Sequence, residues 1–294
     1  KTMNILITGS TGEIGQRLID ELTKIHHFVR TLIHQTPCPI QSYYVTKYRG
    51  DLLDLESLMK ACNGIETIIH MAAVTHTRDK KKYYDVNVKG TGNLISAAEK
   101  MCGQHFIYLS TRAIGEEGGA YSHSKQLAEN KVTACNMKWT IYRPSEVYTG
   151  GSNDAIGRLI EMVKKKSIIP VIGKGDYKLA PVYVDDVVNM IIKSFDNRRV
   201  YGKIYNLSGP DEMTYCEFIN KIMQMNNVKR KIVHIPEGLA KLIIAICSKM
   251  NLTQITPDQI PRLLLEKSAD ISLAKEELRY APVKLENGRF FSQT

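Results

Sequence analysis

The segment AYSHSKQLAEN, residues 120–130, places a tyrosine and a lysine four residues apart. In a helix, positions i and i+4 project from one face, so Tyr121 and Lys125 can both reach one ligand. A free phenol has a pKa of about 10, which is too high for a general base near neutral pH, and a neighbouring ammonium group lowers it. We therefore interpret the pair as a proton-transfer site. The alternative is two amphipathic side chains on a solvated helix face.

Three glycines near the start form a second candidate site. In ILITGSTGEIGQRLIDEL, Gly9, Gly12 and Gly15 follow an apolar strand-like run and lie at the head of a helical pattern. Glycines here permit a tight turn, close approach of a diphosphate to the backbone, and close packing of helix on sheet. The helix N-terminus adds free N–H groups and the positive end of its dipole. The pattern predicts a dinucleotide site; the alternative is a strand–turn–helix with incidental glycines.

The elements that would position these sites alternate along the first half of the chain. The β-rich runs are Asn4–Thr8, Phe28–His34, Tyr44–Arg49, Thr67–Met71, His105–Ser110 and Trp139–Arg143. The helical patterns between them are Ile14–Lys24, Leu55–Cys62, Tyr84–Met101 and Tyr121–Cys135. This alternation predicts an α/β fold, a Rossmann-type doubly wound parallel sheet with helices on both faces.

The regular alternation of strands and helices ends after Pro144, and no flexible linker separates the two halves of the chain. We predict that residues 1–147, together with roughly residues 182–208, form the dinucleotide-binding domain. Residues 148–181 and 209–294 would form a smaller, mainly helical substrate-binding lobe. In that lobe the apolar run LAKLIIAICSKM, starting at Leu239, is too short to span a bilayer. We interpret it as a buried helix, with a monotopic membrane contact as the alternative.

Composition limits the classes of partner. The formal net charge of +10 favours anionic ligands, but the basic residues are scattered and form no basic–aromatic stripe, so we expect no nucleic-acid partner. The six cysteines show no C-x-x-C pair and no zinc-like spacing with histidine. We therefore expect no metal site and the reduced thiols of a cytoplasmic protein. The apolar run at residues 5–8 is too short for a signal peptide.

Taken together, several segments resemble the extended branch of the short-chain dehydrogenase/reductase superfamily, the NAD(P)-dependent epimerases and dehydratases. They are TGSTGEIG, YRGDLLD, IIHMAAVTH, DVNVKGTGNLISAA, FIYLSTRAIG, YSHSK, YRPSEVYTGG and PVYVDDVV, and they cover the chain almost end to end. The resemblance implies hydride transfer at a secondary alcohol carbon, with Tyr121 moving the hydroxyl proton and Lys125 holding the nicotinamide ribose. It also implies that Thr111, or Ser110 beside it, orients the substrate oxygen; the alternative for Thr111 is a cap on the strand's end.

The same resemblance implies a set of cofactor contacts, with Asp51 at the adenine. The set comprises Gly9, Thr11, Gly12, Glu13, Ile14, Gly15, His34, Gln35, Asp51, Leu52, Ala72, Ala73, Asn87, Tyr121, Lys125 and Pro144. The strand FVRTLIHQT ends in His34 and Gln35 instead of the acid that usually holds the ribose of NAD. We therefore expect NAD(P), with NADP favoured over NAD and Arg30, His34 or Gln35 near the 2′-phosphate. Arg30 could instead merely snorkel from the strand.

The resemblance also bears on the substrate. KIYNLSGPDEMTYCEFINKI and SADISLAKEELRYAPVKLENG look like nucleotide-sugar enzymes, although Arg279 stands where glycine is usual. We expect a 4-epimerase or 4-ketoreductase of a nucleotide sugar, because Arg112 and Ala113 stand where dehydratases of this branch carry Asp-Glu. In many relatives an arginine binds the diphosphate of the substrate, and Leu179 stands at that position here. Lys178, Lys174 or Arg158 could take the role of the missing arginine.

Two other interpretations of the function remain open from the sequence alone. One is a ketone reductase for an apolar alcohol, with residues 239–247 lining an apolar pocket; another is a non-catalytic NAD(P)-sensing protein. Asp185 and Asp186 are interpreted as a helix N-cap and a first-turn acid, not as a metal pair. In relatives the helices at Tyr84–Met101 and Tyr121–Cys135 form a dimer face, so a homodimer is expected.

Overall fold

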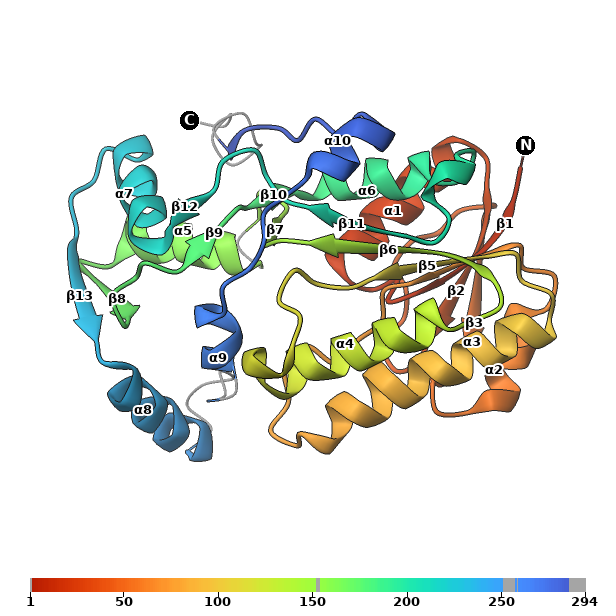
Figure 1. Ribbon diagram of the computed structural model, residues 1–294, viewed down its shortest axis with the longest axis horizontal. Coiled ribbons are helices and arrows are strands. Elements are labelled where there is room, and N and C mark those ends of the chain that lie inside the picture. The colour runs from red at the N-terminus through yellow and green to blue at the C-terminus, as the bar shows by residue number, and fades with distance from the viewer. Residues whose placement is uncertain (1, 152–153, 251–256, 258, 286–294) are drawn as a thin grey trace.

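A large parallel sheet dominates the protein. The computed structural model describes residues 2–151, 154–250, 257 and 259–285 of the chain (Figure 1). Seven strands lie in the order β11-β6-β5-β4-β1-β2-β3, and each neighbouring pair is parallel. Their bounds are β1 Asn4–Thr8, β2 Phe28–Ile33, β3 Val45–Arg49, β4 Thr67–His70, β5 His105–Leu109, β6 Lys138–Pro144 and β11 Lys203–Leu207. The strand order reverses between β1 and β4, where doubly wound sheets bind their ligands. The expected Rossmann-type architecture is confirmed.

Helices cover both faces of the sheet (Figure 1). One layer contains α1 Glu13–Lys24 and α6 Val184–Lys193, which pack on each other; the other contains α2 Leu55–Cys62, α3 Thr91–Lys100 and α4 Gly119–Thr133. Leu18 and Leu22 of α1 lie four residues apart, on one face of the helix, and are fully buried. Each helix layer closes its own apolar core against one side of the sheet. Helix α4, which carries the catalytic candidates, is thus packed into the core on one side of the sheet.

The single helix expected at Tyr84–Met101 is in fact two segments. The first, η1 Tyr83–Gly90, is a π-helix, and α3 continues from it. π-Helical turns occur mostly at functional sites. Here the turn contains Asn87, whose buried side chain bonds both the N–H and the C=O of Val74. A search for 3.6-residue periodicity could not reveal this change of helix type.

The remaining elements are not part of the seven-stranded sheet or of the two helix layers described above. They are η2 Glu116–Gly118, β7 Val147–Tyr148, α5 Ala155–Lys165, β8 Ile168–Ile172, β9 Lys178–Leu179, β10 Val182–Tyr183, η3 Arg198–Val200, β12 Met213–Thr214, α7 Tyr215–Met225, β13 Lys231–Ile235, α8 Glu237–Lys249, α9 Gln259–Leu264 and α10 Ser272–Leu278. Strands β8 and β13 pair in parallel, a pairing that the mainly helical expectation missed because the two strands lie far apart in sequence. We propose that the two-lobe division predicted from the sequence applies to this structure.

The apolar run at residues 239–247 forms α8, but the prediction of a buried helix is wrong. Leu239, Leu242, Ile243 and Ile246 are all exposed to solvent. Apolar composition alone indicated burial, whereas the fold leaves this helix at the edge of the second lobe (Figure 1). Among the described residues, no helix is both long and apolar enough to cross a bilayer.

Candidate active site

The glycine loop between β1 and α1 has room for a ligand but none for extra protein atoms. Gly9 has φ +76°, and a Cβ there would lie 2.7 Å from the backbone nitrogen of Ala72. A Cβ on Gly15 would lie 2.3 Å from the carbonyl oxygen of Gly9. At Gly12 the nearest protein atom to an added Cβ is 3.5 Å away, so space there is left open. Gly12 is also the N-cap of α1 and no side chain caps the helix. The loop therefore fits a diphosphate at a helix N-terminus.

A buried relay of side chains fixes the β4 side of this loop. The Thr8 hydroxyl lies 2.6 Å from His70 Nδ1, and His70 Nε2 lies 2.9 Å from the Thr91 hydroxyl. The N–H groups of Met71 and Ala72 both donate to Thr8 Oγ1. Burial, together with the charge on Lys125, lowers the pKa of His70 to about 3. The relay thus holds the Ala72 backbone against the glycine loop, and its imidazole is neutral. No sequence motif indicated this role of His70.

The neutral His70 makes stability depend on pH. In the unfolded chain the imidazole titrates near its ordinary pKa of 6.5, whereas in the folded protein it stays neutral down to about 3. Between these values the unfolded state binds the extra proton. His70 therefore imposes no penalty above the unfolded value. As pH drops from 6.5 towards 3, its contribution is expected to lower the free energy of unfolding by about 1.4 kcal/mol per pH unit.

Urea unfolding at about pH 7 and about pH 5 measures this slope. The variant His70→Asn should lose part of it, while His76→Asn, which changes an exposed histidine, should keep it. Equal slopes in the wild type and His70→Asn would contradict a neutral buried His70.

The region at the carboxyl ends of β2 and β3 is basic. A hollow of about 300 Å³ is lined by Ile33, His34, Gln35, Pro37, Lys47 and Arg49. His34 Nε2 lies 3.3 Å from an oxygen of Asp51, whose other oxygen accepts the N–H of Leu53. Lys47 and Arg49 were not singled out from the sequence, because only strand pairing brings β3 beside the end of β2. Arg30, one of the expected phosphate contacts, instead donates to the carbonyls of Ala61 and Asn63 and so reaches α2.

Tyr121 and Lys125 both attach to the loop that follows β5. The Tyr121 hydroxyl is hydrogen-bonded to Thr111. The buried Lys125 Nζ donates to the carbonyl of Leu109 at 2.9 Å and lies 4.1 Å from the centre of the Tyr108 ring. The two head groups therefore meet one short stretch, residues 109–111. Ser110 Oγ, in contrast, is buried without a hydrogen-bond partner, which makes Thr111 the better candidate to orient a substrate oxygen.

The electrostatics around Tyr121 differ from the expectation. Burial raises its pKa, while Arg262 and the bond to Thr111 lower it. The guanidinium carbon of Arg262 lies 4.7 Å from the centre of the Tyr121 ring, and its Nη1 donates to the carbonyl of Thr75 at 2.9 Å. Burial also lowers the pKa of Lys125 to about 7. The cation that acts on the phenol here is therefore Arg262 of α9, which sequence spacing could not place beside Tyr121.

Asn87 ties the two walls of the site together. Besides its two bonds to Val74, its Nδ2 donates to Ser124 Oγ at 2.9 Å, and Ser124 donates to the carbonyl of Tyr121. Asn87 thus connects the chain after Ala73 to the first turn of α4. The Asn87 side chain therefore bonds protein groups on both walls, and its expected contact with the cofactor stays a prediction.

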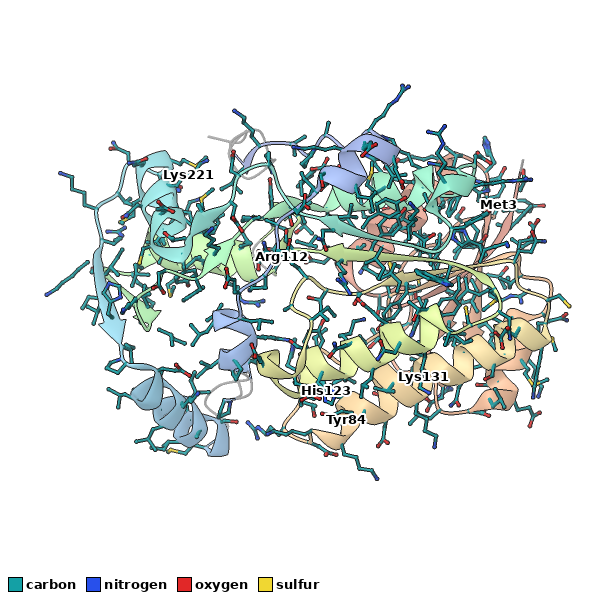
Figure 2. The ribbon with its side chains drawn as sticks, viewed as in Figure 1. Met3, Tyr84, Arg112, His123, Lys131 and Lys221 are labelled. Atoms are coloured by element: carbon teal, nitrogen blue, oxygen red, sulfur yellow. The ribbon has the colours of Figure 1, made fainter. Side chains whose placement is uncertain are left out.

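A buried ion cluster supports the 109–111 loop from behind. The Arg112 side chain, 2% exposed, lies 3.0 Å from Glu146, and Lys267 lies 3.4 Å from the same carboxylate. Although burial raises the pKa of Glu146, Arg112 and Lys267 hold it below its usual value. The backbone N–H of Arg112 also donates to the carbonyl of Pro144. Figure 2 shows Arg112 where the ends of the central strands meet the second lobe.

Two acids that could suggest a metal have other partners. Asp185 forms a two-pronged ion pair with Arg17, and Asp186 accepts the N–H of Val283. Across the residues that the structure describes, no group of three or more histidine, cysteine or acidic side chains could hold a metal ion.

Comparison with known proteins identifies the family of this chain. The model of the family described as "NAD dependent epimerase/dehydratase family" matches residues 5–208. A 3 beta-hydroxysteroid dehydrogenase/Delta 5-->4-isomerase of Mycobacterium tuberculosis is 22% identical over 95% of this chain and 86% of its own. A UDP-glucose 4-epimerase of Vibrio cholerae is 24% identical over 99% and 94%.

Among solved structures, a dTDP-glucose 4,6-dehydratase from Streptomyces venezuelae with NAD bound superposes with a TM-score of 0.80 at 20% identity. It covers 98% of this chain and 95% of its own. This likeness extends the agreement in fold over nearly the whole chain. With its glycine loop, its parallel sheet and a family match over more than two thirds of its length, the chain belongs to the NAD dependent epimerase/dehydratase family of NAD-dependent enzymes.

Proposed function

We propose that the protein is an NAD(P)-dependent oxidoreductase or epimerase that uses Tyr121 to move the proton of a secondary alcohol. The observation that carries the proposal is the convergence of Tyr121 and Lys125 on residues 109–111, at the carboxyl end of β5. That end lies on the same edge of the sheet as the glycine loop, because all seven strands are parallel. When bound, the cofactor supplies or accepts the hydride.

The chain's own residues would bind, orient and transfer the proton. The N–H groups of the Gly9–Gly15 loop hold the diphosphate, and Lys125 is placed to donate to a ribose hydroxyl. Thr111 shares a hydrogen bond with Tyr121 and can hold the substrate oxygen beside the phenol. Because burial raises the pKa of Tyr121, the phenol is protonated near neutral pH and is ready to donate to a carbonyl oxygen. This favours the reductive direction.

We propose NADP as the preferred cofactor, supported by the basic hollow beside His34. Lys47 and Arg49 border it, and a 2′-phosphate would find charged donors there. The double variant Lys47→Ser with Arg49→Ser is expected to weaken NADPH binding roughly tenfold or more, because it removes charge-assisted hydrogen bonds. NADH binding should change little.

Nicotinamide fluorescence titration measures both affinities. Lys138→Ser, which removes an exposed lysine at the other end of the sheet, is the matched control and should leave both unchanged. Equal losses for NADH and NADPH would show that these two residues do not read the 2′-phosphate.

We propose a nucleotide sugar as the substrate, acted on by 4-epimerisation or 4-ketoreduction. Membership of the family and the likeness to a UDP-glucose 4-epimerase support this. One difficulty is how the diphosphate of the substrate would be held. Leu179, which stands in place of the usual arginine, is buried, and Lys178 already pairs with Glu212 at 3.3 Å. Arg112, where dehydratases carry an acid, is held by Glu146, which disfavours dehydration.

A second candidate is a ketone reductase acting on an apolar alcohol, favoured by the likeness to a steroid dehydrogenase. It no longer depends on residues 239–247, because Leu239, Leu242, Ile243 and Ile246 are exposed to solvent. Thermal unfolding with NADPH plus either UDP-sugars or sterol ketones separates the two classes. A stabilising sugar nucleotide that is converted without net NADPH consumption would establish an epimerase; NADPH consumption with a sterol ketone alone would establish the second candidate.

Two further proposals concern the setting of the enzyme. All six cysteines are free, which supports a reduced, cytoplasmic environment. We also propose a homodimer through the outer faces of η1, α3 and α4, where Tyr84 and His123 lie side by side with Oη and Nδ1 3.2 Å apart (Figure 2).

A further inference from the structure

Helix α8 presents most of its large apolar side chains to solvent. The exposed fractions of Leu239, Leu242, Ile243, Ile246 and Met250 are 49%, 57%, 43%, 49% and 63%. Their spacing of three and four residues puts them on one helix face. Ala240 and Ser248, on the other side, are buried. An ordinary surface helix has the opposite orientation, so this face marks an interaction site.

The apolar face continues onto the neighbouring strands. Strand β13 leads directly into α8 through Pro236, and its partner is β8. Ile168 of β8 and Val233 of β13 are exposed by 56% and 37%. Figure 1 shows α8 at the outer end of the second lobe, away from the central sheet. The exposed apolar residues of β8, β13 and α8 therefore gather at one end of the protein, which we name the α8 surface.

The same end of the protein is strongly basic. In residues 161–172 and 228–250 the chain carries eight Lys or Arg and two Glu. Exposed lysines lie at 164, 165, 166, 229, 231 and 241. Glu161 pairs with Lys165 and Glu237 pairs with Lys241, so both acids are already used within the region. Apolar side chains bordered by uncompensated positive charge are complementary to a surface of anionic headgroups over hydrocarbon.

We propose that the α8 surface docks the protein onto an anionic membrane surface. The helix has thirteen residues and is therefore about 20 Å long, too short for a hydrocarbon core of about 30 Å, so it would lie in the interface. Leu242 and Ile246 enter the acyl boundary and the lysines contact the headgroups. A second copy of this chain is a poorer occupant, because a twofold contact would bring two positively charged surfaces together. This inference does not depend on the reaction proposed above.

Co-sedimentation of the full chain with vesicles tests the proposal. Vesicles of phosphatidylcholine mixed with phosphatidylglycerol should bind the protein, and vesicles of phosphatidylcholine alone should bind it much more weakly. Leu242→Gln with Ile246→Gln should reduce binding to the mixed vesicles roughly tenfold or more, because two apolar anchors are lost. Lys164→Gln with Lys166→Gln should reduce it roughly fivefold per lysine and make it less sensitive to salt.

The matched control is Ile25→Gln with Leu273→Gln, which changes two comparably exposed apolar residues away from the α8 surface. It should bind the vesicles as the wild type does. Thermal unfolding confirms that each variant is folded. The proposal is overturned if mixed vesicles do not bind the wild type, or if the control loses binding as much as the α8 variant. It is equally overturned if the α8 substitutions turn a dimer into a monomer without any vesicle binding, which would assign this face to a second copy.

Discussion

The variant Tyr121→Phe is expected to lower kcat by roughly 10²–10⁴ while leaving the affinity for NAD(P)H almost unchanged. The change removes one hydroxyl, which is bonded to Thr111, and keeps the ring that packs against Tyr83 and under Arg262. The proposed diphosphate site lies elsewhere, at the glycine loop. Proton transfer should therefore be lost without loss of binding.

The pH dependence gives a second readout of the same group. Because the pKa of Tyr121 is raised, substrate oxidation, which needs the phenolate, should accelerate as pH rises above neutrality, whereas reduction should slow. Steady-state rates in both directions across pH measure this. The Tyr121→Phe variant should lose both dependences along with its activity.

Tyr84→Phe is the matched control, since it also removes a hydrogen-bonded phenolic hydroxyl, here one shared with His123. Its activity should equal that of the wild type. If Tyr121→Phe turned over at the wild-type rate, the acid–base role would be lost. If the wild type and Tyr121→Phe both bound NAD(P)H but the wild type converted neither UDP-sugars nor sterol ketones, the non-catalytic sensing alternative would gain support.

The variant Gly12→Ala is expected to fold normally yet bind NAD(P)H roughly tenfold or more weakly. An added Cβ would come no closer than 3.5 Å to any protein atom, an ordinary contact. The protein itself therefore does not require glycine at this position. The remaining reason for the open space is a ligand that approaches the backbone at the N-terminus of α1.

Two other glycines separate ligand effects from folding effects. Gly15→Ala would place a Cβ 2.3 Å from the Gly9 carbonyl oxygen, so it should lower Tm as well as cofactor affinity. Gly238→Ala meets nothing within 4 Å and lies in the first turn of α8, so it should leave cofactor affinity unchanged and should not lower Tm. Thermal unfolding and fluorescence titration measure the two quantities. Wild-type affinity in Gly12→Ala would show that the diphosphate does not lie against this loop.

The sequence alone was sufficient for the parts of the protein that are encoded locally. The glycine loop, the alternation of strands and helices, and the four-residue spacing of Tyr121 and Lys125 each depend on residues close together in the chain. Their local geometry is set by backbone freedom at Gly9 and by helix periodicity, which neighbours in sequence determine. The Rossmann-type sheet follows, because strand–helix–strand units cross over with one hand.

Contacts between segments far apart in the chain were decided by the tertiary structure. Arg262 reaches Tyr121 only because α9 packs on α4, and Arg49 borders the hollow beside His34 only because β3 pairs with β2. The buried state of His70 and the exposed state of α8 likewise depend on what the fold puts beside them. The charge on a buried group and the partner of an apolar face are set by three-dimensional surroundings, which neither spacing nor composition specifies.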